Sequence, residues 1–349
     1  AGQAEEEREE KPQRITITAQ MEAPDSRSIP GQMSVITAEQ IEASAPKDVT
    51  DVIEPMLGVN LTRYGGAGSS SFVSIRGSSA EQVLVLVNGK KINTAQGGGA
   101  DLSTINPDAI ERIEVHRGGN SAVYGENAVG GVINIITKEA EKDELSGSAR
   151  AGYGSFETVY GSATVSAANE EETRGFSVSA HGLSSRGDYR FEDEHFGTIE
   201  RKNADSLRGG ASASVFFHPL QTVEVAADGS IYLDERGVPG TVEFPSESAR
   251  MTDERETAGI ETTWESPAGD FIVDGGFTRQ VRKYEEPEFY LGPIDDRHEN
   301  RALEAETRYE DEYAGRSFAV SWLGGYGFRQ DLLDSTAFTG QGGTKYSGD

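Results

Sequence analysis

One long polar stretch of the chain gathers carboxylates that could bind a cation. The stretch 185–203 and its flank carry, among others, Asp188, Glu192, Asp193, Glu194 and Asp205. Side-chain oxygens at this density are the ligands that calcium prefers. A run of acidic residues is also typical of a surface loop that water solvates. The sequence therefore leaves two interpretations of this stretch open, a calcium site and a solvated loop.

The side chains that most often carry catalysis form no catalytic motif. The histidines are scattered over five positions and lack the His-Glu-x-x-His spacing of a zinc protease. No Gly-x-Ser-x-Gly elbow lies between a strand and a helix. Cysteine is absent, so the chain has no thiolate nucleophile, disulfide or cysteine metal site. We expect a protein that is not an enzyme and holds no covalent cofactor.

A cluster of glycines resembles a phosphate-binding loop only superficially. Its members are Gly118, Gly119, Gly125, Gly130 and Gly131. The spacing does not match a P-loop, and no lysine follows in the required place. The net charge of −27 also argues against a nucleic-acid partner, because phosphate binding needs a basic surface. We interpret these glycines as positions where the backbone closely approaches the wall of a β-barrel.

Short strands and short helices alternate over residues 33–137, as in a small α+β domain. The predicted strands are 33–36, 59–62, 72–75, 83–87, 112–116 and 132–137. Thr37 with Gln40 three residues later predicts a capping box, and Asp48 predicts the start of a second helix. Asn88-Gly89 after the apolar run 83–87 is the strongest short signal for a hairpin.

After about residue 144 the pattern changes to long segments of alternating apolar and polar residues. We predict nine such segments, near 145–154, 158–168, 173–184, 204–216, 221–233, 255–265, 270–283, 299–311 and 316–330. Long connections at 185–203, 234–254 and 284–298 alternate with short turns, which is the plan of an outer-membrane β-barrel. A soluble β-sandwich remains the alternative, although its strands are usually shorter. No stretch contains the roughly 20 apolar residues that a membrane helix needs.

The ordered motifs of the chain resemble those of the TonB-dependent outer-membrane receptors, and most closely the cobalamin (vitamin B12) transporter subfamily. The matching segments are Ile15–Ala19, 51–53 with 58–59, 74–77, 83–89, 100–103 and 110–137. The last of these has the order strand, glycine-rich turn, short helix, glycine pair and strand. The resemblance implies an α+β plug domain followed by an antiparallel transmembrane β-barrel.

The resemblance also divides the chain. It implies a disordered acidic tail at 1–13, a TonB box at 14–20, a plug domain at 21–140 and the first part of the barrel at 141–349. A plugged transporter barrel has 22 strands, and this chain supplies about nine or ten of them. We therefore expect a fragment of a longer transporter, truncated within its barrel.

The family's functional residues carry over to particular positions. Ile15, Thr16, Ile17, Thr18 and Ala19 would be the segment that pairs, by strand addition, with a TonB-type energy transducer of the inner membrane. The expected cobalamin contacts are Ser70, Phe72, Ser79, Gly97 and Gly98, and the expected calcium ligands are Asp188 and Asp205. Plug–barrel ion pairs are expected of five residues: Arg76, Arg112, Arg117, Glu111 and Glu114.

The function that the resemblance implies is active uptake of a large metal chelate across the outer membrane of a Gram-negative-type bacterium. Cobalamin is the first expected cargo and a ferric siderophore or other iron chelate is the second. Outer-membrane lipid would surround the barrel. Two alternatives come from other classes: a receptor that signals without transporting, and a secreted β-sandwich adhesin.

Overall fold

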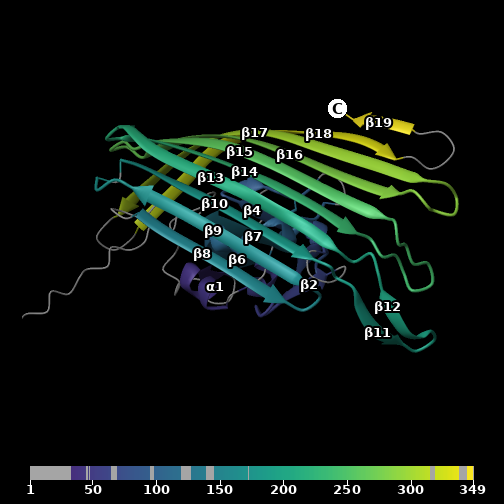
Figure 1. Ribbon diagram of the computed structural model, residues 1–349. Helices are drawn as coiled ribbons and strands as arrows, with labels where there is room; N and C mark the ends of the chain where they lie inside the picture. The colour runs from purple at the N-terminus through teal and green to yellow at the C-terminus, as the bar shows by residue number, and fades with distance from the viewer. Residues whose placement is uncertain are drawn as a thin grey trace, which may run out of the picture.

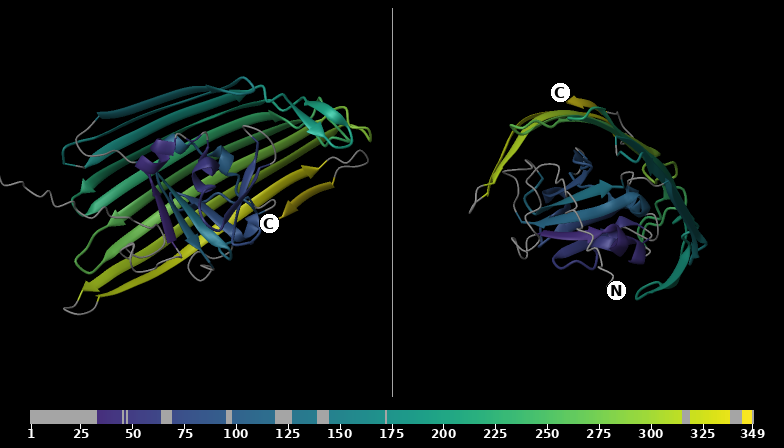
Figure 2. Two further views of the ribbon diagram at one scale, coloured as in Figure 1. Left: turned by 90° about the horizontal axis from the view of Figure 1, so that it is seen from below. Right: turned by 90° about the vertical axis from the view of Figure 1, so that its left-hand side faces the viewer.

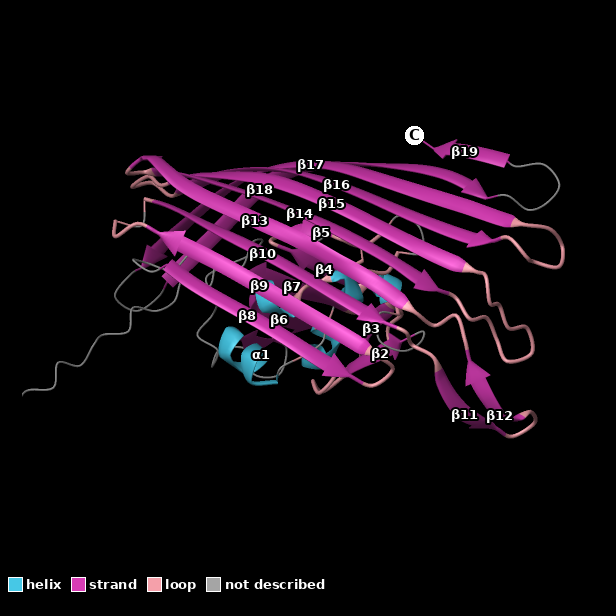
Figure 3. Cartoon of the chain, in the orientation of Figure 1, coloured by secondary structure: helices cyan, strands magenta, loops and turns pink. Residues whose placement is uncertain are grey.

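The computed structural model describes residues 33–44, 46, 48–63, 69–94, 98–118, 127–138, 145–171, 173–314, 319–337 and 344–348. Helices are confined to the first part of the described chain, and strands make up almost all of the rest (Figure 3). Within these residues no helix is both long enough and apolar enough to cross a lipid bilayer. The predicted tail at 1–13 and the predicted TonB box lie outside the described residues.

The described residues 33–138, called the plug below, form a small α+β domain. Its mixed sheet has the order β1 (Met33–Thr37), β6 (Ile110–Arg117), β7 (Gly131–Thr137), β4 (Val83–Val87) and β5 (Lys90–Lys91). Its other elements are α1 (Ala38–Ser44), α2 (Val49–Ile53), the hairpin of β2 (Val59–Arg63) and β3 (Ser71–Ile75), and the 3-10 turns η1 (Ala80–Gln82), η2 (Leu102–Thr104) and η3 (Pro107–Ala109). The predicted strands are confirmed to within two residues at each end.

The local signals act as the sequence predicts. The amide of Thr37 donates to Gln40 Oε1 at 3.1 Å, and the Asp48 carboxylate accepts from the first amides of α2, which removes unpaired donors from each helix start. Asn88 and Gly89 have φ values of 49° and 76°. Positive φ at both central residues is typical of the type I′ hairpin turn, and this turn brings β5 back alongside β4.

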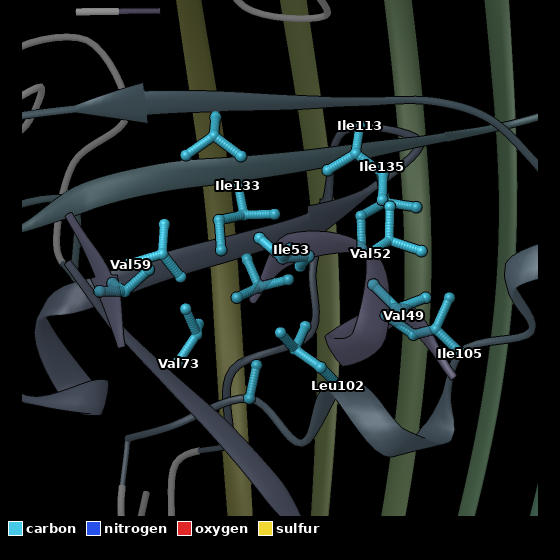
Figure 4. Packing of buried hydrophobic residues seen from close by; sticks show 14 of the residues in the cluster. Val49, Val52, Ile53, Val59, Val73, Leu102, Ile105, Ile113, Ile133 and Ile135 are labelled. Atoms are coloured by element: carbon cyan, nitrogen blue, oxygen red, sulfur yellow. The ribbon is translucent and has the colours of Figure 1, made fainter. Parts of the chain in front are cut away.

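The core of the plug lies between its sheet, α2 and the β2–β3 hairpin (Figure 4). Ile53, Ile113 and Ile133 are fully buried there, and burying such a side chain contributes about 1.5–3 kcal/mol. The strand 83–87 is buried along almost its whole length, as its unbroken apolar run predicts. The core therefore makes the plug a rigid body rather than a collection of loops.

Ten strands form one large antiparallel sheet, called the wall below. They are β8 (Leu145–Gly154), β9 (Thr158–Ala168), β10 (Arg174–Ser185), β13 (Ser206–Leu220), β14 (Val223–Gly237), β15 (Arg250–Trp264), β16 (Asp270–Glu286), β17 (Ile294–Ala314), β18 (Ala319–Ala337) and β19 (Thr344–Gly348). Their order in the sheet follows their order in the chain (Figure 1). The wall curves around the plug as an open arc (Figure 2). The ten strands of the wall form one curved sheet and not two sheets packed face to face, so the sandwich alternative is wrong.

The connections of the wall separate into two rims. The long-loop rim carries 238–249, 287–293 and a small hairpin of β11 (Tyr189–Asp193) and β12 (Gly197–Arg201) between β10 and β13. The opposite, short-turn rim carries connections such as 221–222 and 265–269. The turn 155–157 is an exception to the predicted separation, because strand order places this short turn on the long-loop rim. The sequence also did not predict the β11–β12 hairpin.

Candidate functional site

The two faces of the wall differ in chemistry. Along β14, Ile231 and Leu233 are 54% and 57% exposed on the convex face, while Tyr232 and Asp234 are buried on the concave face. β10 repeats the pattern with exposed Val178 next to buried Ser179. An apolar outer face and a polar inner face are typical of transmembrane barrels. The wall therefore has the surface that lipid requires, and its polar side faces the plug.

An aromatic group marks the convex face near the short-turn rim. Trp264, Phe271 and Tyr309 lie side by side on β15, β16 and β17, with ring centroids 5.5 and 4.7 Å apart. The Tyr309 hydroxyl donates to the carbonyl of Ala268 in the adjoining turn. Rings that are apolar on one side and polar at the tip favour a membrane–water interface. This group indicates one edge of the lipid-facing band.

Wall arginines hold the plug segment that contains η2 and η3. Arg208 donates to the Ser103 carbonyl at 2.9 Å in a buried contact, and Arg255 donates to the Thr104 carbonyl at 3.2 Å. Arg150 donates to Asp108 at 2.9 Å. Carbonyls and carboxylates at a domain surface lose water when they dock, and a charged donor offsets that loss. These three arginines form an anchoring seam between the plug and strands β8, β13 and β15.

A second contact joins the plug to the wall near the long-loop rim. Arg236 donates to Ser70 Oγ at 2.8 Å and to Asp253 at 2.6 Å. Asp253 lies on β15, and Arg282 on β16 donates to the same carboxylate at 2.6 Å. Ser70 is one of the predicted cargo contacts, and its hydroxyl touches the wall in this structure. The apical loop of the plug is thus tied to the rim through which a cargo would enter.

The structure brings most of the predicted cargo contacts together. A Cβ added at Gly99 would lie 3.0 Å from the ring of Phe72 and 3.5 Å from Ala80, so the loops that hold Phe72, Ser79 and Gly98 are neighbours. Gly97 lies outside the described residues. The four described residues, Ser70, Phe72, Ser79 and Gly98, are called the apical set below. Whether they touch a cargo stays a prediction.

Two members of the apical set also have local structural roles. Ser79 caps η1 and donates its amide to Gln82 Oε1 at 3.2 Å. Gly98 has a φ of +68°, a conformation that L side chains rarely adopt, and a Cβ there would lie 2.8 Å from Glu81 Cβ. These two residues fix the shape of the apical loops.

The predicted calcium ligands lie on the long-loop rim. Asp205 accepts two hydrogen bonds of 2.8 Å from Arg250. Among the residues that the structure describes, no three acidic or histidine side chains gather closely enough to hold a metal ion. Calcium binding by Asp188 and Asp205 stays a prediction, and it would require Asp205 to share its oxygens with Arg250.

The charged residues of the plug sheet pair first within the plug. Glu114 is fully buried and accepts from Arg112 at 2.9 Å, while Glu111 accepts from Arg112 at 2.8 Å. Burial lowers the pKa of Arg117, and the nearby positive charge of Arg76 lowers it further. The expected plug–barrel ion pairs of Arg76 and Arg117 stay predictions, whereas these two ion pairs of Arg112 lie inside the plug.

Sequence reasoning missed the residues that carry the plug–wall contacts. The expected approach to the wall is wrong for the described glycines Gly118, Gly130 and Gly131, because the atoms nearest to an added Cβ there belong to the plug itself. The ion pair of Lys90 with Asp228 on β14 was not predicted, nor were the arginines of the anchoring seam. A usable signal was present, because arginine and aspartate recur at inward positions of β13 to β16. The alternation shows which residues face inward, but not which plug atom each one meets.

The comparisons with known proteins agree with this geometry. Residues 25–132 match the family model described as the TonB-dependent Receptor Plug Domain. Over 140 residues the chain is 39% identical to the vitamin B12 transporter BtuB of Vibrio vulnificus strain YJ016, a match that covers 40% of this chain and 23% of that protein.

Solved structures have the same fold. The chain is similar to the ferric citrate transporter FecA in its unliganded form, with a TM-score of 0.72 and 17% identity over 93% of this chain and 52% of that one. It is also similar to the siderophore receptor PirA of Acinetobacter baumannii, with a TM-score of 0.67 and 21% identity over 89% of this chain and 49% of that one. The chain spans less than a quarter of the curated relative and about half of these solved structures.

Proposed function

We propose that the protein carrying this chain, which has the plug domain of the TonB-dependent receptors of the outer membrane, imports a large metal chelate, with cobalamin as its first cargo. One observation carries the proposal: a folded plug occupies the polar, concave side of a wall whose convex side is apolar (Figure 2). A plugged passage of this kind suits regulated passage of a large solute. The 39% identity to a vitamin B12 transporter over 140 residues supports cobalamin as the cargo.

The proposed cycle begins at the long-loop rim. The cargo binds the apical set, whose Ser70 is already tied to the rim by Arg236. Because Ser70 and Phe72 flank the start of β3, a cargo that shifts them also pulls on the plug core through Val73 and Ile75. Binding at the apex is thereby coupled to the body of the plug.

The energy comes from a partner. The segment Ile15–Ala19 adds as a strand to the edge of a TonB-type transducer of the inner membrane, since an extended peptide with β-branched residues suits strand addition. The transducer then pulls the plug and opens a path for the cargo. No bond of the cargo needs to change in this cycle.

A binding titration of the full-length protein tests the choice of cargo. Cyanocobalamin and several ferric siderophores are titrated separately, each with and without calcium. We expect saturable corrinoid binding at micromolar concentration or below, weakened by Phe72→Ala and not by Phe271→Ala, the same change on the lipid-facing side. Binding of a siderophore without any corrinoid binding would favour the iron-chelate alternative and contradict the cobalamin proposal.

A further inference from the structure

Three cavities lie in series between the plug and strands β10 to β18. The rim cavity, of about 60 Å³, is lined by Thr94, Asp101, Tyr232 and Asp253 among others. The middle cavity, of about 50 Å³, reaches Ser230 and Thr257. The lower cavity, of about 250 Å³, reaches Glu224, Glu261 and Asp274. Along β14 these cavities meet positions 232, then 228–230, then 224–228, so they descend in order from the long-loop rim towards the short-turn rim.

Neighbouring cavities have some of their lining residues in common. Ile92 and Arg255 line both the rim cavity and the middle cavity. Lys90 and Asp228 line both the middle cavity and the lower cavity. Their ion pair, 2.5 Å long, joins β5 of the plug to β14 of the wall. This pair therefore lies at the partition that separates the two lower spaces.

The wall leaves space for the side chain of Lys90 beside Asp228. Asp228 lies opposite Gly259 in the β14–β15 register, and Gly259 lies opposite Gly276 on β16. A Cβ added at Gly259 would overlap Lys90 Cε and Nζ. The side chain of Lys90 thus occupies a slot that exists because position 259 has no side chain. Only 8% of the Lys90 side chain is exposed, against 25% for Asp228.

The plug holds the lysine rigidly at its other end. Lys90 directly follows the Asn88-Gly89 turn, and Asn88 is fixed to β7 by hydrogen bonds of 2.8 and 3.0 Å to Thr137. Any movement of the β4–β7 part of the plug sheet must therefore move Lys90. The lower cavity also offers the lysine new partners, Glu261 and Asp274, on the side towards the short-turn rim. Lys90 can move downward from one carboxylate to the next without losing every counter-charge.

We propose that the passage for the cargo runs along these three cavities and that the Lys90–Asp228 pair is the latch that closes it. The proposal rests on the proposed import function and locates its path within the plug–wall interface. In the closed state the latch separates the middle and lower cavities. Pulling on the plug withdraws Lys90 from the slot at Gly259 and joins the two spaces. The anchoring seam on β8, β13 and β15 holds the 101–109 segment beside this path.

The test uses water-soluble maleimide labelling of single cysteines in the full-length protein, in a background without other cysteines. Ser230→Cys reports on the middle cavity, and Ser166→Cys is its control, since both serines pair with one hydroxyl across a strand and Ser166 lines none of the three cavities. We expect Lys90→Met and Asp228→Asn each to raise the labelling rate of Ser230→Cys about tenfold. A tenfold rise corresponds to about 1.4 kcal/mol in the opening equilibrium. The double variant should add little beyond either single change, because the two residues act as a unit.

Two further variants keep the test decisive. Gly259→Ala leaves both charges in place and should raise labelling by displacing Lys90. Lys91→Met, the same change on the next residue, should leave labelling unchanged. Equal rises at Ser230→Cys and Ser166→Cys, or no rise with Lys90→Met, would overturn the latch.

The outcome is separable from that of the proposed function. If wild-type protein imports cyanocobalamin while the Lys90→Met labelling rate stays at the wild-type value, the latch is wrong and import stands. If no chelate is bound or imported, the import proposal fails whatever the labelling shows. In energised cells with cyanocobalamin, wild-type Ser230→Cys should label faster than in cells without it.

Discussion

Arg208 offers a direct measure of how strongly the wall holds the plug. Its side chain is 5% exposed, donates to the Ser103 carbonyl at 2.9 Å and lies 4.0 Å from Asp48. Arg208→Met keeps most of the apolar stem and removes the charged donor. A buried hydrogen bond from a charged group contributes about 1.5–3 kcal/mol. We therefore expect the equilibrium for opening of the plug to rise roughly ten- to hundredfold.

Hydrogen exchange of the full-length protein measures this opening locally. Amides of α2 and η2 should lose protection in Arg208→Met, while amides in the middle of β14 should keep it. Arg186→Met is the matched control, because the Arg186–Glu157 pair lies on the surface with side chains 63% and 60% exposed. Exposed pairs contribute about 0–1 kcal/mol. Equal protection in Arg208→Met and Arg186→Met would refute the role of the anchoring seam.

Three smaller predictions concern the plug itself, each measured by hydrogen exchange or by unfolding of the full-length protein. Asp48→Ala should destabilise α2 by about 1 kcal/mol, because it removes the cap of that helix. Gly98→Ala should destabilise the apical loop by about 1–2 kcal/mol, since its φ is +68° and the new Cβ would meet Glu81; unchanged protection there would contradict the turn geometry. Burial lowers the pKa of His116 below its ordinary 6.5, although Glu114 opposes the shift. Because the unfolded state binds the proton more readily, the contribution of His116 to plug stability should be fully present above about pH 6.5. The free energy of unfolding should then fall as the pH drops towards the folded-state pKa, by at most about 1.4 kcal/mol per pH unit. His116→Asn should remove that slope.

The plug was predictable because its signals are local. The unbroken run 83–87, the Asp48 cap and the Asn88-Gly89 turn each determine the conformation of a few adjacent residues.

The first two strands of the wall were also predictable, because β8 and β9 begin and end where the alternation of apolar and polar residues does. A period of two on a strand with one lipid face and one polar face leaves little ambiguity.

The ends of the longer strands were less predictable, for a physical reason. β17 spans Ile294–Ala314, whereas alternation supports only 299–311. Beyond the lipid-facing band a strand continues to pair through its backbone, but water surrounds both faces, so apolar alternation stops before the pairing does. The β11–β12 hairpin was not predicted either, because its acidic residues led to the interpretation of the stretch as a solvated loop or a calcium site.

The contacts between plug and wall could not be read from the sequence. Lys90 and Asp228 are 138 residues apart, and nothing local distinguishes this lysine from Lys91 beside it. What selects Lys90 is the slot at Gly259, which the lysine meets only once the plug sits inside the wall. The apical set came from the resemblance to the cobalamin transporters, and its contact with a cargo stays a prediction.

Energised uptake of labelled cyanocobalamin by cells that carry the full-length protein tests the central claim most directly. The comparison is between wild type and Ile17→Pro, since proline cannot donate to a strand ladder and should stop strand addition by the Ile15–Ala19 segment. The account predicts that both proteins bind the corrinoid equally and that only wild type accumulates it. Equal accumulation by both, or no binding by either, would contradict it.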